Sequence, residues 1–416
     1  MARILEARAR GGRLRALGSG GSKSEVTAVP GEGVLPPSGD ALLRVDGDRV
    51  TVAPGVTTYQ LQALLRERGL TLPTVGEWRN ATLGGAILTG THGGSARHGI
   101  MAASLRGLRV VSGAGDVHVL SPGDEDFRHV PVSFGALGVV TSLTLVCEPH
   151  FSLRMETDVV PFREYGVDPV AQESRSEFHS SIWVPTAARV IRFAADRAPA
   201  PGSTVRRRAR FGRWTAMANF LARRFGLHAA VSPRIFARTA LGDCADILSP
   251  LDVPPRVARL RNRLNGRRGR RAAELAVPAR DAAAALARFQ ELFLKYERTL
   301  NNPIGLRMSA ADDFTLSPCQ GRDTLWLDVF YDASPAFEEA LAEVAGQVDA
   351  RCHWGKTLAL APSVLRARYP GWADFHAARN RLDPDQVFAN PFTDLLGLTD
   401  RGGAGEGRRP GEGDPS

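Results

Sequence analysis

Residues 81–95 read Ala-Thr-Leu-Gly-Gly-Ala-Ile-Leu-Thr-Gly-Thr-His-Gly-Gly-Ser, and this stretch decides the fold. Its five glycines stand among small and hydroxyl-bearing residues. Because glycine lacks a Cβ and tolerates positive φ, backbone N–H groups in such a segment approach a ligand closely and surround phosphate oxygens. Residues 17–22, Leu-Gly-Ser-Gly-Gly-Ser, have the same chemistry. One such loop is equally well explained as a tight turn, whereas two loops together indicate a phosphate-binding site.

The segments around these loops indicate an α+β fold. Neither loop has the Gly-x-Gly-x-x-Gly pattern of a Rossmann unit or the Gly-Lys-Ser/Thr of a P-loop. Short apolar runs flank turn residues at 42–52 and again at 108–120, which predicts two hairpins, and 139–146 reads as a further strand. A capping box from Thr57 to Gln60 predicts one helix between them. Mixed strands with few helices favour α+β over a doubly wound parallel sheet.

The remainder of the chain has a different character. Apolar residues at helical spacing predict helices at 281–296 and 335–350, and 324–331 between them reads as a strand. Residues 200–272 are Arg-rich and poorly periodic, and we interpret them as irregular helices. Residues 401–416 contain almost nothing apolar and are expected to be disordered.

Composition excludes several classes of protein. With 416 residues the chain is long enough for two domains, and no apolar run is long enough to cross a bilayer. The N-terminus lacks a secretory signal, and the four cysteines form no C-x-x-C pair, so we expect reduced thiols, no metal site and a cytoplasmic protein. The net charge of +9 lies largely in arginine runs at 206–210 and 267–271. Without interleaved aromatic residues these runs favour a solvated surface over nucleic-acid binding.

The motifs, in their order along the chain, resemble a known family. The two glycine loops, followed by Gly-Ala-Leu-Gly-Val-Val-Thr at 135–141, resemble the PCMH-type FAD-binding domain of the vanillyl-alcohol-oxidase superfamily. Leu306-Arg307 with Asp312-Asp313, then His-Trp-Gly-Lys at 353–356 and Leu-Asp-Pro at 382–384, are similar to the branch of alditol oxidases and of gulonolactone and arabinonolactone oxidases. The resemblance extends from about residue 14 to 398.

The resemblance implies a domain plan. Residues 1–150 would form the PCMH-type FAD-binding domain of two α+β subdomains, and 151–364 a cap or substrate domain with an antiparallel sheet and flanking helices. Residues 365–398 would return to the FAD domain, and 399–416 would be a tail. Relatives carry an extra strand and helix before the segment matching residues 13–18. The recorded start would therefore lie downstream of the native one, or the first flavin subdomain would be shortened.

The resemblance also implies a cofactor, FAD, and a set of site residues. Arg307 and Lys356 match the family's active-site cations, and His353 is a further catalytic candidate. Cations in a water-poor pocket would stabilise negative charge on substrate oxygen and on the reduced flavin. The residues expected to bind FAD are Gly18, Ser19, Gly20, Gly21, Ser22, Thr82, Gly85, Thr89, Gly90, Thr91, His92, Gly93, Ser133 and Val140. His92 and His353 are equally well explained as structural histidines.

Departures from the family pattern concern the flavin link and the substrate pocket. Many relatives carry, at the position of Gly21, a histidine bonded covalently to the flavin 8α-methyl, so FAD is predicted to be non-covalent here. The Glu-x-Arg pair of the family is Gly305-Leu306-Arg307, and Glu77 stands where polyol oxidases place Ser. Asp328 and Phe330 fall on the strand where relatives place pocket-facing His and Thr. The added carboxylates would favour a cationic substrate such as an amino sugar or aminocyclitol.

The function predicted from these features is FAD-dependent oxidation of a carbinol on a sugar-like, polyol, lactone or amino-sugar substrate. Hydride would pass to flavin N5, and O2 would reoxidise the flavin with release of H2O2. We expect a small-molecule substrate, no nucleic-acid or membrane partner, and a monomer or homodimer. The alternatives are a flavin dehydrogenase with a non-O2 acceptor or a 2-hydroxy acid substrate, and a non-catalytic flavin-fold or basic nucleic-acid-binding protein.

Overall fold

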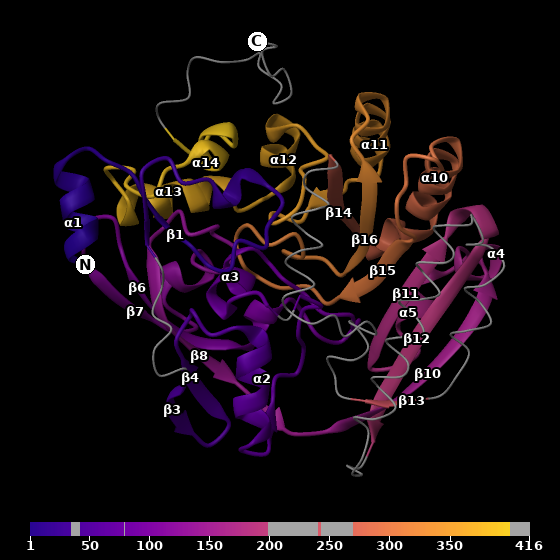
Figure 1. The fold of residues 1–416 in the computed structure, drawn as a ribbon, viewed down its shortest axis with the longest axis horizontal. Helices are drawn as coiled ribbons and strands as arrows, with labels where there is room; N and C mark the ends of the chain where they lie inside the picture. The colour runs from indigo at the N-terminus through magenta and orange to yellow at the C-terminus, as the bar shows by residue number, and fades with distance from the viewer. Residues whose placement is uncertain (35–41, 79, 199–239, 243–268, 400–416) are drawn as a thin grey trace.

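The protein, represented by a computed structural model, is described at residues 1–34, 42–78, 80–198, 240–242 and 269–399. It is α+β, as the sequence predicts. A five-stranded sheet lies on one side and an eight-stranded antiparallel sheet on the other, with helices around both (Figure 1). Within the described residues, no helix combines the length and apolar character that crossing a membrane requires.

The five-stranded sheet has the order β3-β4-β8-β6-β7 and is antiparallel throughout. Its strands are β3 (Leu42–Asp46), β4 (Arg49–Val52), β6 (Leu105–Val111), β7 (Val117–Leu120) and β8 (Val139–Val146). Both predicted hairpins and the third strand are therefore confirmed. β8 lies at the centre because Val140, Leu143 and Leu145 turn one apolar face into the core.

The helix predicted after the first hairpin is confirmed as α2 (Thr58–Arg66), and its start shows how local sequence sets the element. Thr57 accepts a hydrogen bond from the amide of Gln60, whose side chain accepts one from the amide of Thr57. Leu61 and Leu65 lie on the buried face. The smaller elements on this side are α1 (Ala2–Ala9), β1 (Leu14–Ala16), β2 (Glu32–Val34), β5 (Leu70–Thr71), α3 (Leu83–Leu88) and β9 (Glu148–Pro149).

The eight-stranded sheet has the order β13-β10-β12-β11-β15-β16-β14-β17. Its strands are β10 (Ser152–Pro161), β11 (Phe178–Val184), β12 (Arg189–Ala198), β13 (Ala240–Gly242), β14 (Arg270–Pro278), β15 (Ile304–Ser309), β16 (Thr324–Asp332) and β17 (Arg351–Cys352). Helices α10 (Ala282–Lys295) and α11 (Pro335–Gln347) stand together beside β14 and β16 (Figure 1). Helix α4 (Phe162–Tyr165) contacts β10 and β12, and α5 (Pro169–Glu173) contacts β11. Both long helices and the strand between them were predicted.

The C-terminal helices pack against the N-terminal segments. Helices α12 (Pro362–Arg368), α13 (Trp372–Leu382) and α14 (Pro391–Leu395) lie on the side of α1 (Figure 1). The amide of Leu14 donates to the carbonyl of Val387 at 2.7 Å. The side-chain amide of Asn390 donates to three backbone carbonyls of residues 25–28, and Asp383 accepts from two backbone amides of its own turn. The Leu-Asp-Pro motif at 382–384 and Asn390 therefore have a structural role, because they hold the C-terminal segment against the N-terminal one.

Two expectations fall largely outside the described residues. The tail at 401–416 and most of the Arg-rich stretch at 200–272 are not among them. Where that stretch is described, the prediction of irregular helices is wrong, because 240–242 lies in β13 and 270–272 in β14. The apolar run that reveals β14 begins only at Ala272, where the Arg-rich stretch ends.

Candidate active site

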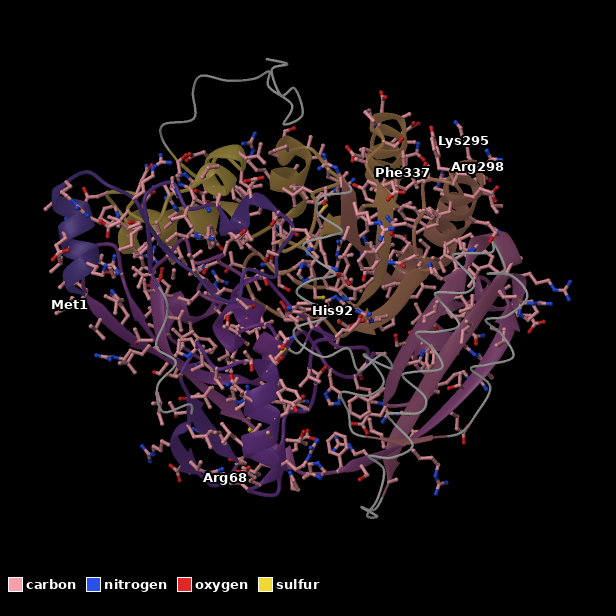
Figure 2. The ribbon with its side chains drawn as sticks, in the orientation of Figure 1. Met1, Arg68, His92, Lys295, Arg298 and Phe337 are labelled. Atoms are coloured by element: carbon pink, nitrogen blue, oxygen red, sulfur yellow. The ribbon has the colours of Figure 1, made fainter. Side chains whose placement is uncertain are left out.

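A cavity of about 590 Å³ lies between the glycine loops and the eight-stranded sheet. Strands β14, β15 and β16 and the turn after β17 form one wall, and the loops around 15–27 and 77–92 form the other. His92 projects between the two halves near the centre of the molecule (Figure 2). The residues predicted from the sequence that line the cavity are Gly18, Ser19, Gly20, Gly21, Ser22, Glu77, Thr82, Gly85, Thr89, Thr91, His92, Val140, Arg307, Asp328, Phe330, His353 and Lys356.

Four predicted residues lie behind this wall. Gly90 adopts φ +75° in the turn after α3, a conformation that favours glycine. The carbonyl of Gly93 lies 2.9 Å from Nδ1 of His92. Ser133 is buried, and Gly305 lies on β15 facing Asp328. These four shape the loops and strands but do not border the cavity.

The absence of side chains at two glycines lets the loops approach each other. A Cβ on Gly18 would lie 2.3 Å from Oγ1 of Thr82, and a Cβ on Gly76 would lie 2.3 Å from Cγ2 of Thr91. Thr82 caps α3 by accepting from the amide of Gly85 at 3.3 Å. A larger side chain at Gly18 or Gly76 would therefore separate the loops.

Buried donors on the cavity wall fit a dinucleotide such as FAD. Arg15 is 3% exposed, and its Nη2 donates to the carbonyls of Val26 and Phe134. Both Arg15 and Trp78 line the cavity, and Nη1 of Arg15 and the indole Nε1 of Trp78 have no hydrogen-bond partner among the described residues. Burial lowers the pKa of Arg15 to about 10, so it stays protonated at neutral pH. Unpartnered buried donors are costly unless a ligand accepts from them, and phosphates and flavin ring atoms are acceptors.

Trp78 also explains why residue 21 is glycine. A Cβ on Gly21 would lie 3.1 Å from Nε1 of Trp78. The indole thus occupies the space that a longer side chain at position 21 would need. Trp78 was not singled out from the sequence, because nothing local relates it to a loop more than fifty residues earlier.

The two predicted cations face the cavity, each next to a carboxylate. Nη2 of Arg307 lies 2.5 Å from Oε2 of Glu77, and Nζ of Lys356 lies 3.2 Å from Oδ1 of Asp328. Burial alone would lower the pKa of both cations, but the nearby carboxylates outweigh it and raise both pKa values. Nε of Arg307 is buried and has no partner among the described residues. Both groups are therefore fixed positive charges, and Arg307 retains a donor for a ligand.

A third carboxylate, Glu274, joins this cluster and was missed in the sequence. Its side chain is 4% exposed and lies 3.0 Å from Nε2 of His92, 3.6 Å from Nζ of Lys356 and 4.0 Å from Nη1 of Arg307. Burial would raise its pKa, but Lys356 and His92 outweigh burial and hold the pKa well below the ordinary value. A signal did exist, because Glu274 is the sole charged residue of the apolar run 272–277.

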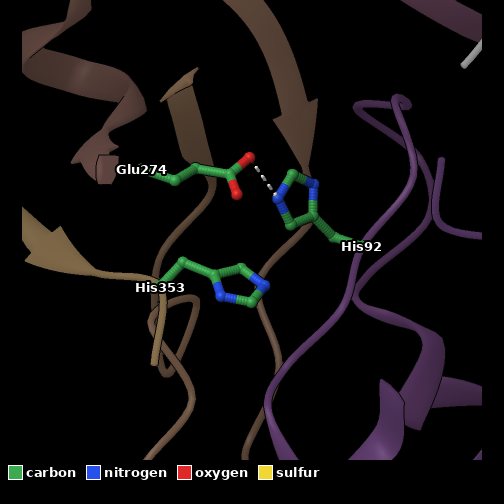
Figure 3. Close-up of side chains that lie close together, drawn as sticks. All are labelled: His92, Glu274 and His353. Carbon is green, nitrogen blue, oxygen red and sulfur yellow. Dashed lines mark hydrogen bonds and ion pairs between the residues drawn. The ribbon is translucent and has the colours of Figure 1, made fainter. Parts of the chain in front are cut away.

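His92, Glu274 and His353 converge with potential metal-ligating atoms within 4.8 Å of one another (Figure 3). The sequence predicts no metal here, and the surrounding charges disfavour one, since Lys356 and Arg307 already compensate Glu274. Burial lowers the pKa of His353 to about 3, so its ring is neutral. Its Nδ1 accepts from the amide of Gly355 at 3.0 Å. His353 thus lines the cavity as a neutral side chain and adds no third positive charge.

Comparison with known proteins identifies the family. Residues 267–396 match the D-arabinono-1,4-lactone oxidase family, and residues 2–121 match the FAD binding domain family. The L-gulono-1,4-lactone dehydrogenase of Mycobacterium tuberculosis is 30% identical over 400 residues, which cover 94% of this chain and 91% of that protein. The chain belongs to the family of FAD-linked sugar-lactone and alditol oxidoreductases. The alditol oxidase of a Streptomyces species is 29% identical over 364 residues, 83% of this chain and 81% of that protein.

This FAD-linked oxidoreductase has the PCMH-type flavin fold of the vanillyl-alcohol-oxidase superfamily, so the resemblance stated from the motifs is confirmed. The structure of cholesterol oxidase from Brevibacterium sterolicum superposes with a TM-score of 0.72 and covers 95% of this chain and 91% of that chain. At 16% identity this likeness shows a shared fold alone.

Proposed function

We propose that this oxidoreductase oxidises a carbinol group on a small, polar, sugar-like molecule such as a polyol or a sugar lactone. The observation that carries the proposal is the pair of protonated cations, Arg307 and Lys356, on the cavity wall opposite the glycine loops. The names of two relatives agree with this class, since one acts on L-gulono-1,4-lactone and another on alditols.

The residues of the cavity suit this chemistry. Bound FAD would supply the hydride acceptor. Arg307 and Lys356 would stabilise the negative charge that develops on the substrate oxygen as its hydroxyl loses a proton, and preorganised charges do this best where water is excluded. The ring centroid of Phe330 lies 5.2 Å from Nζ of Lys356, so the aromatic face helps to hold this ammonium group in place.

The test is an anaerobic substrate screen on FAD-reconstituted protein. Alditols, aldonolactones, amino sugars, aminocyclitols and 2-hydroxy acids are mixed with the protein, and loss of the oxidised-flavin absorbance is followed. We expect bleaching by a sugar-like alcohol. Bleaching by 2-hydroxy acids alone would support the dehydrogenase alternative, and a colourless protein that takes up no FAD would support the non-catalytic one.

We assign O2 as the acceptor that reoxidises the flavin, with H2O2 as product. Relatives named as an oxidase and as a dehydrogenase both match this chain, so the alternative acceptor is a redox dye or quinone. The substrate-reduced protein is mixed with air-saturated buffer or with dichlorophenolindophenol. Reoxidation that is fast only with the dye would overturn the assignment to O2.

The flavin is expected to be held without a covalent bond. Gly21 has no atom that could bond the 8α-methyl, and Trp78 fills the adjacent space with an indole N–H able to donate to the cofactor. Acid precipitation should release all flavin to the supernatant and leave no fluorescent protein band on a denaturing gel. Loss of one neutral hydrogen bond costs about 0.5–1.5 kcal/mol, so Trp78→Phe should weaken FAD binding about two- to tenfold. Flavin that stays on the denatured band would contradict the prediction that FAD is bound without a covalent link.

A second substrate class, amino sugars or aminocyclitols, is favoured by the charges grouped around Arg307 and Lys356. Three carboxylates, Glu77, Glu274 and Asp328, lie within 4.0 Å of these two cations, whereas Arg15 and Lys23 line the same cavity on the side of the glycine loops. Each carboxylate already contacts a cation, so an ammonium group would have to compete for it. Matched pairs such as an aminocyclitol and its neutral cyclitol decide the point, through the ratio of their kcat/KM values.

We also propose a cytoplasmic location and a monomeric or homodimeric state. Cys147, Cys319 and Cys352 are buried free thiols in the structure, and unpaired thiols are typical of a reducing compartment. Cell fractionation and size-exclusion chromatography with light scattering test the two statements separately.

A further inference from the structure

Asp328 lies in the middle of β16, where the other residues of the run 325–331 are apolar or aromatic. Its neighbours on β16, Leu327 and Val329, are fully buried. The register places Gly305 of β15 and Glu274 of β14 directly opposite Asp328 on its two sides. Burying a carboxylate in such a strand costs folding free energy unless the group is paired with a cation or serves a function.

Gly305 is what makes room for this acid. A Cβ on Gly305 would lie 3.3 Å from Cβ of Asp328, so a glutamate at position 305 would compete with Asp328 for the same space. The family pattern has Glu-x-Arg at this point, whereas here the carboxylate stands one strand away. Across the paired positions Gly305, Asp328 and Glu274, the acids near Arg307 therefore project from β16 and β14, and not from position 305 of β15.

The Asp328 carboxylate has one hydrogen-bond partner and one oxygen to spare. Its side chain is 9% exposed and lines the cavity. Oδ1 accepts from Nζ of Lys356 at 3.2 Å, and the described residues make no hydrogen bond to Oδ2. Burial raises the pKa of Asp328 most, to about 6, while Lys356 and Arg307 lower it and Glu274 and Glu77 raise it. The group is thus ionised at neutral pH and still has an appreciable affinity for a proton.

We propose that Asp328 is the catalytic base of the oxidation, taking the proton of the substrate hydroxyl as Lys356 and Arg307 stabilise the oxygen. The inference rests on the proposed function. The substrate O–H proton passes to the carboxylate and then to water. The hydrogen on the carbinol carbon leaves with its electron pair to FAD, the oxidant, and the alcohol, two electrons poorer, becomes a carbonyl.

The test compares three variants by the rate of anaerobic flavin reduction across pH 5 to 9. Asp328→Asn keeps the shape of the side chain but accepts no proton, and loss of a general base costs about 10²- to 10⁴-fold in rate. The wild-type rate should rise with pH through about 6 and then level, since only the ionised carboxylate is active. Asp328→Asn should lose that rise, and Asp328→His should restore a pH-dependent rate. Glu77→Gln, which removes a different cavity carboxylate, should keep the rise.

FAD affinity of each variant, measured by fluorescence titration, serves as the readout of folding. If Asp328→Asn binds FAD and reduces it within about tenfold of wild type with the same pH dependence, the inference is wrong while the proposed function stands. If Asp328→Asn does not bind FAD, the pH profile of Asp328→His decides, and a rate that shows no rise with pH in this variant overturns the inference. A wild-type protein that no alcohol reduces overturns both.

Discussion

Arg307→Met is expected to lower kcat/KM for the best alcohol substrate by about 10²- to 10³-fold, the usual cost of removing one preorganised donor to a developing oxyanion. Methionine retains most of the length of the side chain but neither its charge nor its donors. The buried Nε of Arg307 has no partner among the described residues, which points to a ligand as its acceptor. Steady-state kinetics measure the loss, and flavin absorbance verifies that FAD stays bound.

Two control variants separate charge from geometry. Arg307→Lys keeps the charge and loses the planar fork of donors, so it should recover part of the lost rate. Lys295→Met removes a cation at the end of α10, far from His92 (Figure 2), and should not change the kinetics. An Arg307→Met enzyme within about threefold of wild type would show that this cation stabilises no charge in the transition state.

The five-stranded sheet and the long helices were predictable because their determinants are local. The capping box at Thr57 predicts the first turn of α2, and Gly47 with its flanking apolar runs predicts the first hairpin. Apolar residues at helical spacing likewise predict α10 and α11. The strand β14 was not predicted, because the Arg-rich stretch before it obscures where its apolar run begins.

Residues of the site were predictable only where they belong to a recognisable sequence motif. Arg307 and Lys356 were found through their flanking sequence, and the structure places both on the same cavity. Glu274 and Trp78 have no such flank, since their importance comes from partners far away in the chain. Glu274 meets His92 because the His92 ring stacks on Trp326 of β16, the strand that pairs with β14. That pairing cannot be derived from residue periodicity. Residues that belong to a local motif were therefore predicted, whereas residues brought to the site by long-range strand pairing were found only in the structure.

Glu274→Ala is expected to destabilise the protein more than any other single carboxylate change in the cavity. Removing one member of a buried charge cluster costs about 3–5 kcal/mol, because the remaining charges are left uncompensated. Here Lys356 and Arg307 would each keep one carboxylate partner, Asp328 and Glu77, but lose the buried one, and His92 would lose its hydrogen-bond partner. For a protein of this size the thermal midpoint should fall by about 3–6 °C, measured by circular dichroism on the FAD-free protein.

Glu77→Gln is the matched control for this change. Glu77 makes the shorter ion pair, at 2.5 Å to Arg307, but its side chain is 49% exposed, and exposed pairs contribute about 0–1 kcal/mol. Since the pKa of Glu274 is depressed in the folded protein, its contribution is complete above the unfolded pKa of about 4.3 and is lost as pH falls through the folded value. The gap in midpoint between wild type and Glu274→Ala should therefore be full at pH 7 and shrink only in acid. If Glu77→Gln lowers the thermal midpoint as much as Glu274→Ala does at pH 7, the burial of Glu274 is not the reason for its larger contribution to stability.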